Sequence, residues 1–316
     1  MRKSFVFAAG LLLSAMGSAQ KNPCAVAGNN NAYLGIETVR LWPGDAPMAT
    51  GKQCTDIPTL TVFAPEAGQE NGSAVVILPG GAYAILAANL EGRQVADWFT
   101  SRGFRAFVLS YRLTSNGYVL PVPLLDARRA IQTVRAGAGR YSIDPNRIVV
   151  IGFSAGGHLA ALSGTQFVAG NPEAEDPIER VSSRPDYMVL AYPWIGAISS
   201  DTSHLSYCKI FKLMDRCEAL RTAYSPDLFV SKETPKTFWY HTFDDPTVPV
   251  EQGLRFYEAM VKAGVPMEAH LFATGPHGTG LGKGDAALDQ WTSLLEVWLR
   301  AQGLLTPRVA PKAGGQ

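Results

Sequence analysis

The stretch Gly152-Phe153-Ser154-Ala155-Gly156 decides the fold of this chain, because it places one serine at a sharp turn from a strand into a helix. Residues 147–151 before it read Arg-Ile-Val-Val-Ile, which is typical of a fully buried strand. Residues 157–162 after it are rich in helix formers. The Gly-x-Ser-x-Gly pattern alone also occurs in glycine-rich loops without catalytic function. The prediction therefore depends on the strand before the pattern and the helix after it. We expect the Ser154 hydroxyl to project above a sheet edge, facing amides that open a helix.

A serine hydroxyl needs a general base within hydrogen-bond reach, and that base needs a third group to orient it. With this turn the chain order should be Ser, then Asp or Glu, then His. His277 lies in the Gly- and Pro-rich loop 274–280, directly after the strand-like residues 268–273, and is free to reach over the sheet. We therefore predict His277 as the general base. Packing, strand or exposed roles suit the remaining histidines better: His158, His204, His241 and His270.

The acid should lie in the loop 242–249, which reads Thr-Phe-Asp-Asp-Pro-Thr-Val-Pro and follows the strand-like residues 236–241. Asp244 and Asp245 are adjacent there, and neighbours on an extended segment point opposite ways. The following Pro246 biases Asp245 toward an extended backbone. We predict Asp245 as the acid, with Asp244 as a loop cap or solvated charge.

Two main-chain donors are needed for the oxyanion that forms when the serine attacks. One should be the amide of Ala155, and the second should come from a loop after an earlier central strand. Residues 74–78 predict that strand, and Pro-Gly-Gly-Ala-Tyr follows it at residues 79–83. We predict Gly81 and Ala82 as the donors of this loop. An ordinary turn is the alternative.

Taken together, these motifs resemble the α/β-hydrolase superfamily, and more narrowly its acetyl-esterase and carboxylesterase branch, whose members are often called carbohydrate acetyl esterases or xylanases. The resemblance implies Ser154 as nucleophile, Asp245 as acid and His277 as base, with no metal or organic cofactor. It also implies a short-acyl ester as substrate, either a small molecule or an acetylated carbohydrate. The oxyanion loop departs from the family's histidine- and glycine-rich pattern at Pro79 and Ala82. The matching segments are residues 78–83, 110–113, 123–130, 144–148, 152–159, 245–249 and 276–278.

The alternation of predicted strands and helices indicates an α/β fold with a mainly parallel central sheet, helices on both faces and a small insert. The hydrophobic fraction of 47% and charged fraction of 17% suit one packed domain over residues 20–316. A net charge of +1 without a basic run argues against nucleic acid as a partner. Expected strands cover residues 33–42, 59–64, 74–78, 104–111, 147–151, 188–192, 237–240 and 268–272, and expected helices 90–101, 121–136, 252–263 and 285–299.

Residues 1–19 predict a cleavable signal peptide, with basic residues first, an apolar middle and Gly-Ser-Ala before Gln20. No later stretch has the length of a membrane span, so we expect a secreted or periplasmic protein. Four cysteines fit an oxidising compartment and permit three pairings. The predicted pairing joins Cys24 to Cys54 and Cys208 to Cys217.

Residues 194–234 break the alternating pattern and form either a lid over the site or a surface elaboration. Other functions also have to be weighed. A serine peptidase of this fold normally adds a large N-terminal propeller, for which the chain has no room. A glycoside hydrolase needs two carboxylates about 5–10 Å apart, and no such pair stands out. A binding protein on this scaffold usually loses one of the three candidate residues.

Overall fold

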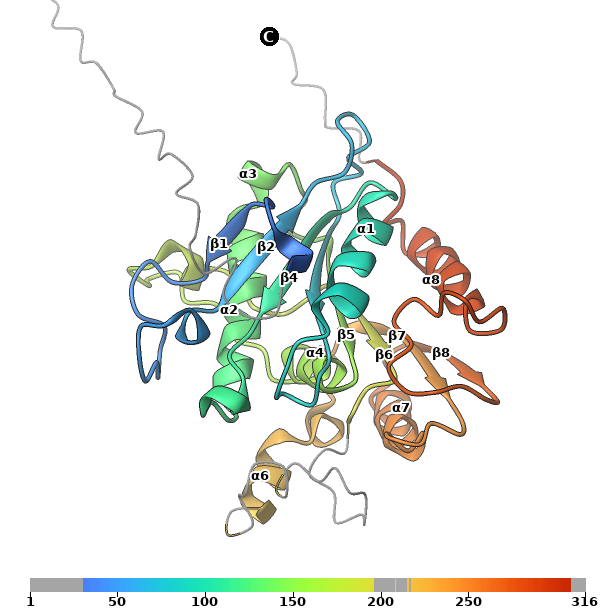
Figure 1. Ribbon diagram of the computed structural model, residues 1–316. Helices are drawn as coiled ribbons and strands as arrows, with labels where there is room; N and C mark the ends of the chain where they lie inside the picture. The colour runs from blue at the N-terminus through green and yellow to red at the C-terminus, as the bar shows by residue number, and fades with distance from the viewer. Residues whose placement is uncertain (1–30, 196–207, 209–214, 216, 308–316) are drawn as a thin grey trace, which may run out of the picture.

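An eight-stranded sheet forms the centre of the computed structural model, which describes residues 31–195, 208, 215 and 217–307 (Figure 1). The strand order is β1-β2-β4-β3-β5-β6-β7-β8. The β1–β2 and β2–β4 pairs are antiparallel, and all other neighbours are parallel. The strands are β1 (Thr38–Arg40), β2 (Thr59–Phe63), β3 (Ala74–Leu78), β4 (Arg105–Ser110), β5 (Ile148–Phe153), β6 (Tyr187–Ala191), β7 (Lys236–Thr242) and β8 (Met267–Phe272).

Helices cover both faces of this sheet. Apolar residues of α2, α4 and α7 pack on one face, and those of α1 and α8 pack on the other (Figure 1). The α-helices are α1 (Gln94–Thr100), α2 (Val122–Ala136), α3 (Ala138–Tyr141), α4 (Ala155–Thr165), α6 (Cys217–Tyr224), α7 (Glu251–Ala263) and α8 (Gln290–Ala301). Shorter turns are η2 (Asn31–Tyr33), η3 (Cys54–Asp56), η4 (Ala88–Arg93, π-helical), η5 (Thr114–Asn116), η6 (Pro177–Arg180) and η8 (Pro226–Phe229).

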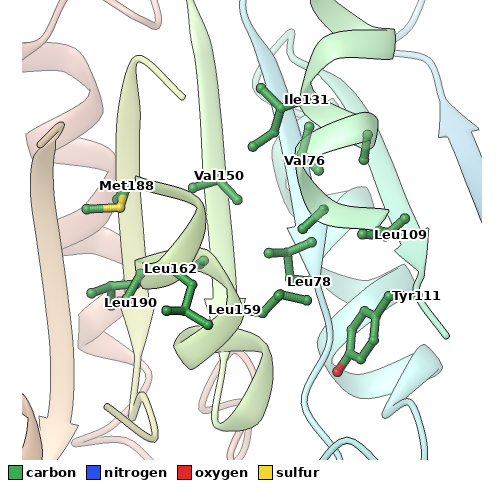
Figure 2. Packing of buried hydrophobic residues seen from close by; sticks show 14 of the residues in the cluster. Val76, Leu78, Leu109, Tyr111, Ile131, Val150, Leu159, Leu162, Met188 and Leu190 are labelled. Atoms are coloured by element: carbon green, nitrogen blue, oxygen red, sulfur yellow. The ribbon is translucent and has the colours of Figure 1, made fainter. Parts of the chain in front are cut away.

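The central strands are apolar on both faces because each face is covered by helices. In β3, Val76 and Leu78 face α2 and α4, whereas Val75 and Ile77 face α1 and α8. Figure 2 shows the first of these clusters, in which Val150 of β5 lies between Val76 of β3 and Met188 of β6. The two-residue period of a buried strand thus fills two separate cores.

The mainly parallel sheet with helices on both faces confirms the fold class expected from the sequence. The first strand was expected over residues 33–42 but covers only Thr38–Arg40. Tyr33 belongs to the turn η2 instead, and its buried hydroxyl donates to the carbonyl of Ala88 (2.8 Å). The last helix was expected from residue 285 but begins at Gln290, because the Asp285 carboxylate accepts from two amides of a preceding turn.

Candidate active site

Ser154 lies at the turn from β5 into α4, with a backbone φ of +52°. This left-handed conformation is rare for a residue with a side chain and stores strain at the turn. Glycine is required where β5 and α4 approach: a Cβ on Gly152 would lie 2.1 Å from the carbonyl oxygen of Gly156. The close approach aims the Ser154 side chain out of the carboxyl end of the sheet.

His277 and Asp245 come from the loops after β8 and β7, and the structure brings both to Ser154. The His277 Nε2 atom lies 2.8 Å from Ser154 Oγ, and its Nδ1 atom lies 2.7 Å from Asp245 Oδ2. The other Asp245 oxygen accepts from the amides of Thr247 (2.8 Å) and Val248 (2.9 Å). Three side chains distant in sequence therefore form one hydrogen-bonded line, with the imidazole between hydroxyl and carboxylate.

Asp245 remains ionised in this arrangement. Burial alone would raise the pKa of Asp245, but hydrogen bonds from His241, His277 and the Val248 amide, together with the charge of His277, hold that pKa well below its usual range. His241 is fully buried, with Nε2 3.5 Å from Asp245 Oδ2 and 3.0 Å from the carbonyl oxygen of Val248. The carboxylate is therefore fixed from its own loop and from the strand below it.

The neighbouring Asp244 binds the backbone of the loop that carries His277. Its Oδ1 atom accepts from the amide of Gly275 (2.8 Å), and the Thr242 hydroxyl donates to the carbonyl of the same glycine (3.0 Å). Asp244 thus caps the loop that carries His277, which is one of the two roles expected from the sequence.

The loop 79–83 after β3 has three consecutive residues with positive φ: Gly81 (+129°), Ala82 (+53°) and Tyr83 (+60°). Glycine is needed at position 81, since a Cβ there would lie 2.3 Å from the carbonyl oxygen of Ile85. Within the described ranges, the amides of Gly81, Ala82 and Ala155 donate no hydrogen bond. Gly81 and Ala82 line the same cavity as Ser154, and Ala155 opens α4 directly after it. All three amides are available to an anion beside Ser154.

Buried side chains far away in the sequence fix this loop. The Tyr111 hydroxyl donates to the carbonyl of Pro79 (2.7 Å), and Glu91 Oε2 accepts from the amide of Gly80 (2.7 Å). His158 Nδ1 lies 2.8 Å from the Tyr83 hydroxyl. Sequence reasoning gave His158 a supporting role but missed the contacts of Tyr111 and Glu91. Tyr111 did fall within a segment matching the family, whereas Glu91 carried no signal.

A cavity of about 550 Å³ opens onto Ser154 and His277. Much of its wall is apolar, and the only carboxylate among the described residues that line it is Glu91. The lining residues are Gly81, Ala82, Ala84, Ile85, Ala87, Leu90, Glu91, Ser154, Trp194, Thr247, Val248, His277 and Gly278. The space suits an acyl chain or a ring beside the serine.

The remaining histidines lie outside this cavity or outside the described chain. His158 is buried, and its Nε2 atom lies 2.8 Å from the carbonyl oxygen of Tyr224 in α6. His270 pairs with Glu268 on β8 (2.8 Å). His204 belongs to the segments that are not described.

The insert 194–234 is described only at its two ends and at isolated positions. Cys208 and Cys217 form a disulfide, as predicted. The other predicted pairing, of Cys24 with Cys54, involves a residue outside the described range, as does the signal peptide 1–19. Trp194 lines the cavity, and α6 projects from the body of the molecule near α4 (Figure 1).

None of the helices in the described part of the chain combines the length and apolar character required to cross a membrane. In the same part of the chain, no three His, Cys, Asp or Glu side chains gather in a way that would hold a metal ion.

A mostly parallel sheet of this order, with a strained serine after β5 and carboxylate and imidazole loops after β7 and β8, defines an α/β-hydrolase. Comparison with known families gives the narrower assignment. The chain belongs to the BD-FAE family, whose model matches residues 60–260.

Curated relatives and solved structures agree with this assignment. The chain is 33% identical over 246 residues to an acetylxylan esterase of Xylanibacter ruminicola, covering 77% of this chain and 48% of that protein. It therefore spans about half the length of this relative. The comparisons support the class of ester hydrolases.

Two solved structures match this chain over nearly their whole length. An acetyl ester-xyloside bifunctional hydrolase from Caldicellulosiruptor lactoaceticus has a TM-score of 0.75 and 38% identity, covering 84% of this chain and 96% of that one. A propionate-bound thermophilic esterase from Thermogutta terrifontis has a TM-score of 0.70 and 28% identity, covering 87% and 97%. That esterase is also known in a form phosphonylated by sarin.

Proposed function

We propose that this protein is a secreted serine ester hydrolase that cleaves short-chain carboxylic esters, in particular acetyl esters, including those on carbohydrate. The observation that carries this proposal is the line of hydrogen bonds from Asp245 through His277 to Ser154, with distances of 2.7 and 2.8 Å. A base at that distance can take the hydroxyl proton as the oxygen attacks.

The reaction runs in two halves. His277 Nε2 accepts the Ser154 proton while Oγ forms a bond to the ester carbonyl carbon, giving a tetrahedral oxyanion. His277 then gives the proton to the alcohol oxygen, the ester C–O bond breaks and the acyl group stays on Ser154. Water, deprotonated by His277, attacks the acyl-enzyme in the second half, and the serine recovers its proton as the acid leaves.

Charge in the site matches each step. Asp245 is held ionised, so it stabilises the imidazolium that forms on His277. The amides of Ala155, Gly81 and Ala82 donate to no other group within the described chain and can receive the oxyanion. One preorganised donor of this kind contributes about 10²–10³ in turnover.

The substrate proposal rests on the relatives and on the cavity. The Xylanibacter relative is an acetylxylan esterase, and the Caldicellulosiruptor hydrolase acts on acetyl esters and xylosides by its name. A cavity of about 550 Å³ with Ile85, Leu90 and Trp194 on its wall leaves room for an acyl group beside Ser154. A glycosidase reaction is not favoured, because Glu91, the sole carboxylate among the described lining residues, uses both oxygens in internal hydrogen bonds.

Covalent labelling tests the serine assignment. A fluorophosphonate probe should add one group per chain, and peptide mass spectrometry should map it to Ser154. The Ser154→Ala variant should take no label and lose nearly all p-nitrophenyl acetate hydrolysis while keeping its circular dichroism spectrum. Label on another residue, or an active variant, contradicts the proposal.

Substrate class needs a separate comparison. We expect p-nitrophenyl acetate to be hydrolysed with a higher kcat/KM than longer acyl esters, and acetate to be released from acetylated xylo-oligosaccharides. A preference for long acyl chains, or no acetate release from the oligosaccharides, would exclude the acetyl-carbohydrate assignment.

The proposal of secretion rests on the basic and apolar residues 1–19 and on the Cys208–Cys217 disulfide. Expression of the full chain with export should give a mature protein whose N-terminus is Gln20. A chain that retains Met1 would contradict it.

A further inference from the structure

Glu91 is a buried carboxylate beside the reacting groups that the mechanism above does not use. Its side chain lies in the π-helical turn η4, is only 3% exposed and still contributes to the wall of the cavity. Burial of an anion is costly unless hydrogen bonds compensate it. Glu91 has such bonds on both oxygens, and the two donors belong to different parts of the active site.

The first donor is the oxyanion loop. Glu91 Oε2 accepts from the amide of Gly80 at 2.7 Å, and a Cβ on Gly80 would itself lie 2.7 Å from that oxygen. The carboxylate is therefore pressed directly against the backbone just before Gly81. Because the Gly80 amide is held, the backbone of the next two residues, which line the cavity together with Ser154, is held in place.

The second donor, the Tyr192 hydroxyl, also contacts the loop that carries His277. Glu91 Oε1 accepts from the Tyr192 hydroxyl at 2.9 Å, and that hydroxyl accepts from the amide of Gly280 at 2.8 Å. The Tyr192 ring packs edge-on against the His277 ring, with centroids 5.0 Å apart. Tyr192 follows β6, so it spans the gap between the loops after β3 and β8.

We propose that Glu91 is a positioning residue which, together with Tyr192, locks the oxyanion loop and the His277 loop into one catalytic geometry. This inference rests on the proposed ester hydrolysis. Hydrogen bonds on both carboxylate oxygens tie the two loops to one buried side chain, so the geometry of one loop depends on that of the other.

The surroundings of Glu91 act on its charge in both directions. Burial is the largest influence and raises the pKa of Glu91 above its usual range, while the hydrogen bonds from Tyr192 and Gly80 and the charge of His277 act in the opposite direction. The hydrogen bonds on Glu91 act through the positions of the two loops, so their loss affects turnover more than substrate binding.

Three variants test the assignment with p-nitrophenyl acetate. Glu91→Gln keeps the shape but removes the charge, and we expect kcat to fall about 10–100-fold with KM changed less than about threefold. Tyr192→Phe removes only the bridging hydroxyl, and we expect a fall of about 3–30-fold. Both changes break the same chain of hydrogen bonds between the two loops. The fold loss of kcat in the double variant should therefore be clearly smaller than the product of the two single fold losses.

Tyr33→Phe is the matched control. It removes another buried hydrogen bond to η4, at the carbonyl of Ala88, without touching Gly80 or Tyr192. It should lower Tm while leaving kcat within about twofold of the wild type. A Glu91→Gln enzyme with wild-type kcat, or with the same loss of activity as Tyr33→Phe, overturns the assignment. If Glu91→Gln does not fold, an unchanged kcat in Tyr192→Phe overturns it instead.

The same assays separate this inference from the proposed function. Wild-type hydrolysis together with an inactive Ser154→Ala variant supports the serine mechanism whatever Glu91 does. Stoichiometric fluorophosphonate labelling of Glu91→Gln at long times would show an intact nucleophile, so a low kcat then reports positioning. If Ser154→Ala remains active, the serine mechanism fails first.

Discussion

The two sides of the active site are held in different ways. The loop 79–83, the proposed oxyanion loop, is fixed by the buried side chains of Tyr111, Glu91 and His158, which reach it from other elements. The loops that carry Asp245 and His277 are joined to each other, through Asp244 and Thr242 to Gly275, and are also held by the buried side chains of His241 and Tyr192. The first side is held by side chains from other elements, whereas the second side also has hydrogen bonds between its own two loops.

Strain explains why the first side needs more support. Ala82 and Tyr83 have positive φ although neither is glycine. Such conformations cost about 1–3 kcal/mol each and persist only where the surroundings impose them. The loops of the second side do not carry such a run, because the positive φ angles among their described residues belong to glycines.

The largest expected effect is a difference in kcat between variants of the two adjacent aspartates, Asp245 and Asp244. Asp245→Asn can still accept from the Thr247 and Val248 amides but cannot stabilise an imidazolium, so kcat should fall about 10³–10⁴-fold. Asp244→Asn keeps an acceptor for the Gly275 amide and should stay within about threefold of the wild type. Steady-state kinetics of both variants check this, and equal losses would contradict the assignment of Asp245.

A smaller loss of kcat is expected when a methyl group is added at Gly81 in the loop 79–83. Gly81→Ala sets a Cβ against the Ile85 carbonyl and should displace the loop amides, lowering kcat about 10²–10³-fold. Gly264→Ala is the control: Gly264 also has positive φ, but it lies at the end of α7, where an added Cβ would meet no atom within 4 Å. The control should lose stability and keep its turnover. Wild-type kcat in Gly81→Ala would show that the loop does not hold the oxyanion.

The smallest effect concerns stability and pH. Burial lowers the pKa of His158 to about 4 from 6.5, so the folded protein keeps this imidazole neutral while the unfolded chain takes up a proton. The contribution of His158 is complete above pH 6.5 and is lost as the pH falls toward 4. The loss amounts to on the order of 3 kcal/mol in the free energy of unfolding.

Urea unfolding of the wild type and of His158→Gln over this pH range measures that contribution. The wild type should lose stability more steeply than the variant as the pH is lowered. Parallel curves would mean that His158 titrates alike in both states. They would also weaken the claim that buried side chains from other elements stabilise the loop 79–83.

Local patterns predicted much of this molecule, and long-range contacts account for the rest. The Gly-x-Ser-x-Gly turn, the alternation of strands and helices and the chain order each depend on neighbouring residues or on a family pattern. Glu91 could not be found in this way, because its partners Gly80 and Tyr192 are 11 and 101 residues away. The predicted first strand was too long, because the sequence around Tyr33 gave no sign that this residue contacts η4 instead of joining the sheet.

The strand order has a consequence for how the protein refolds. Ser154 follows a central strand, whereas His277 follows β8 at the end of the strand order, and their contact closes a separation of 123 residues. Contacts this distant in sequence are costly to form early. Hydrolysis cannot return after denaturation until β8 has docked, so a stopped-flow ester assay would time the completion of the sheet.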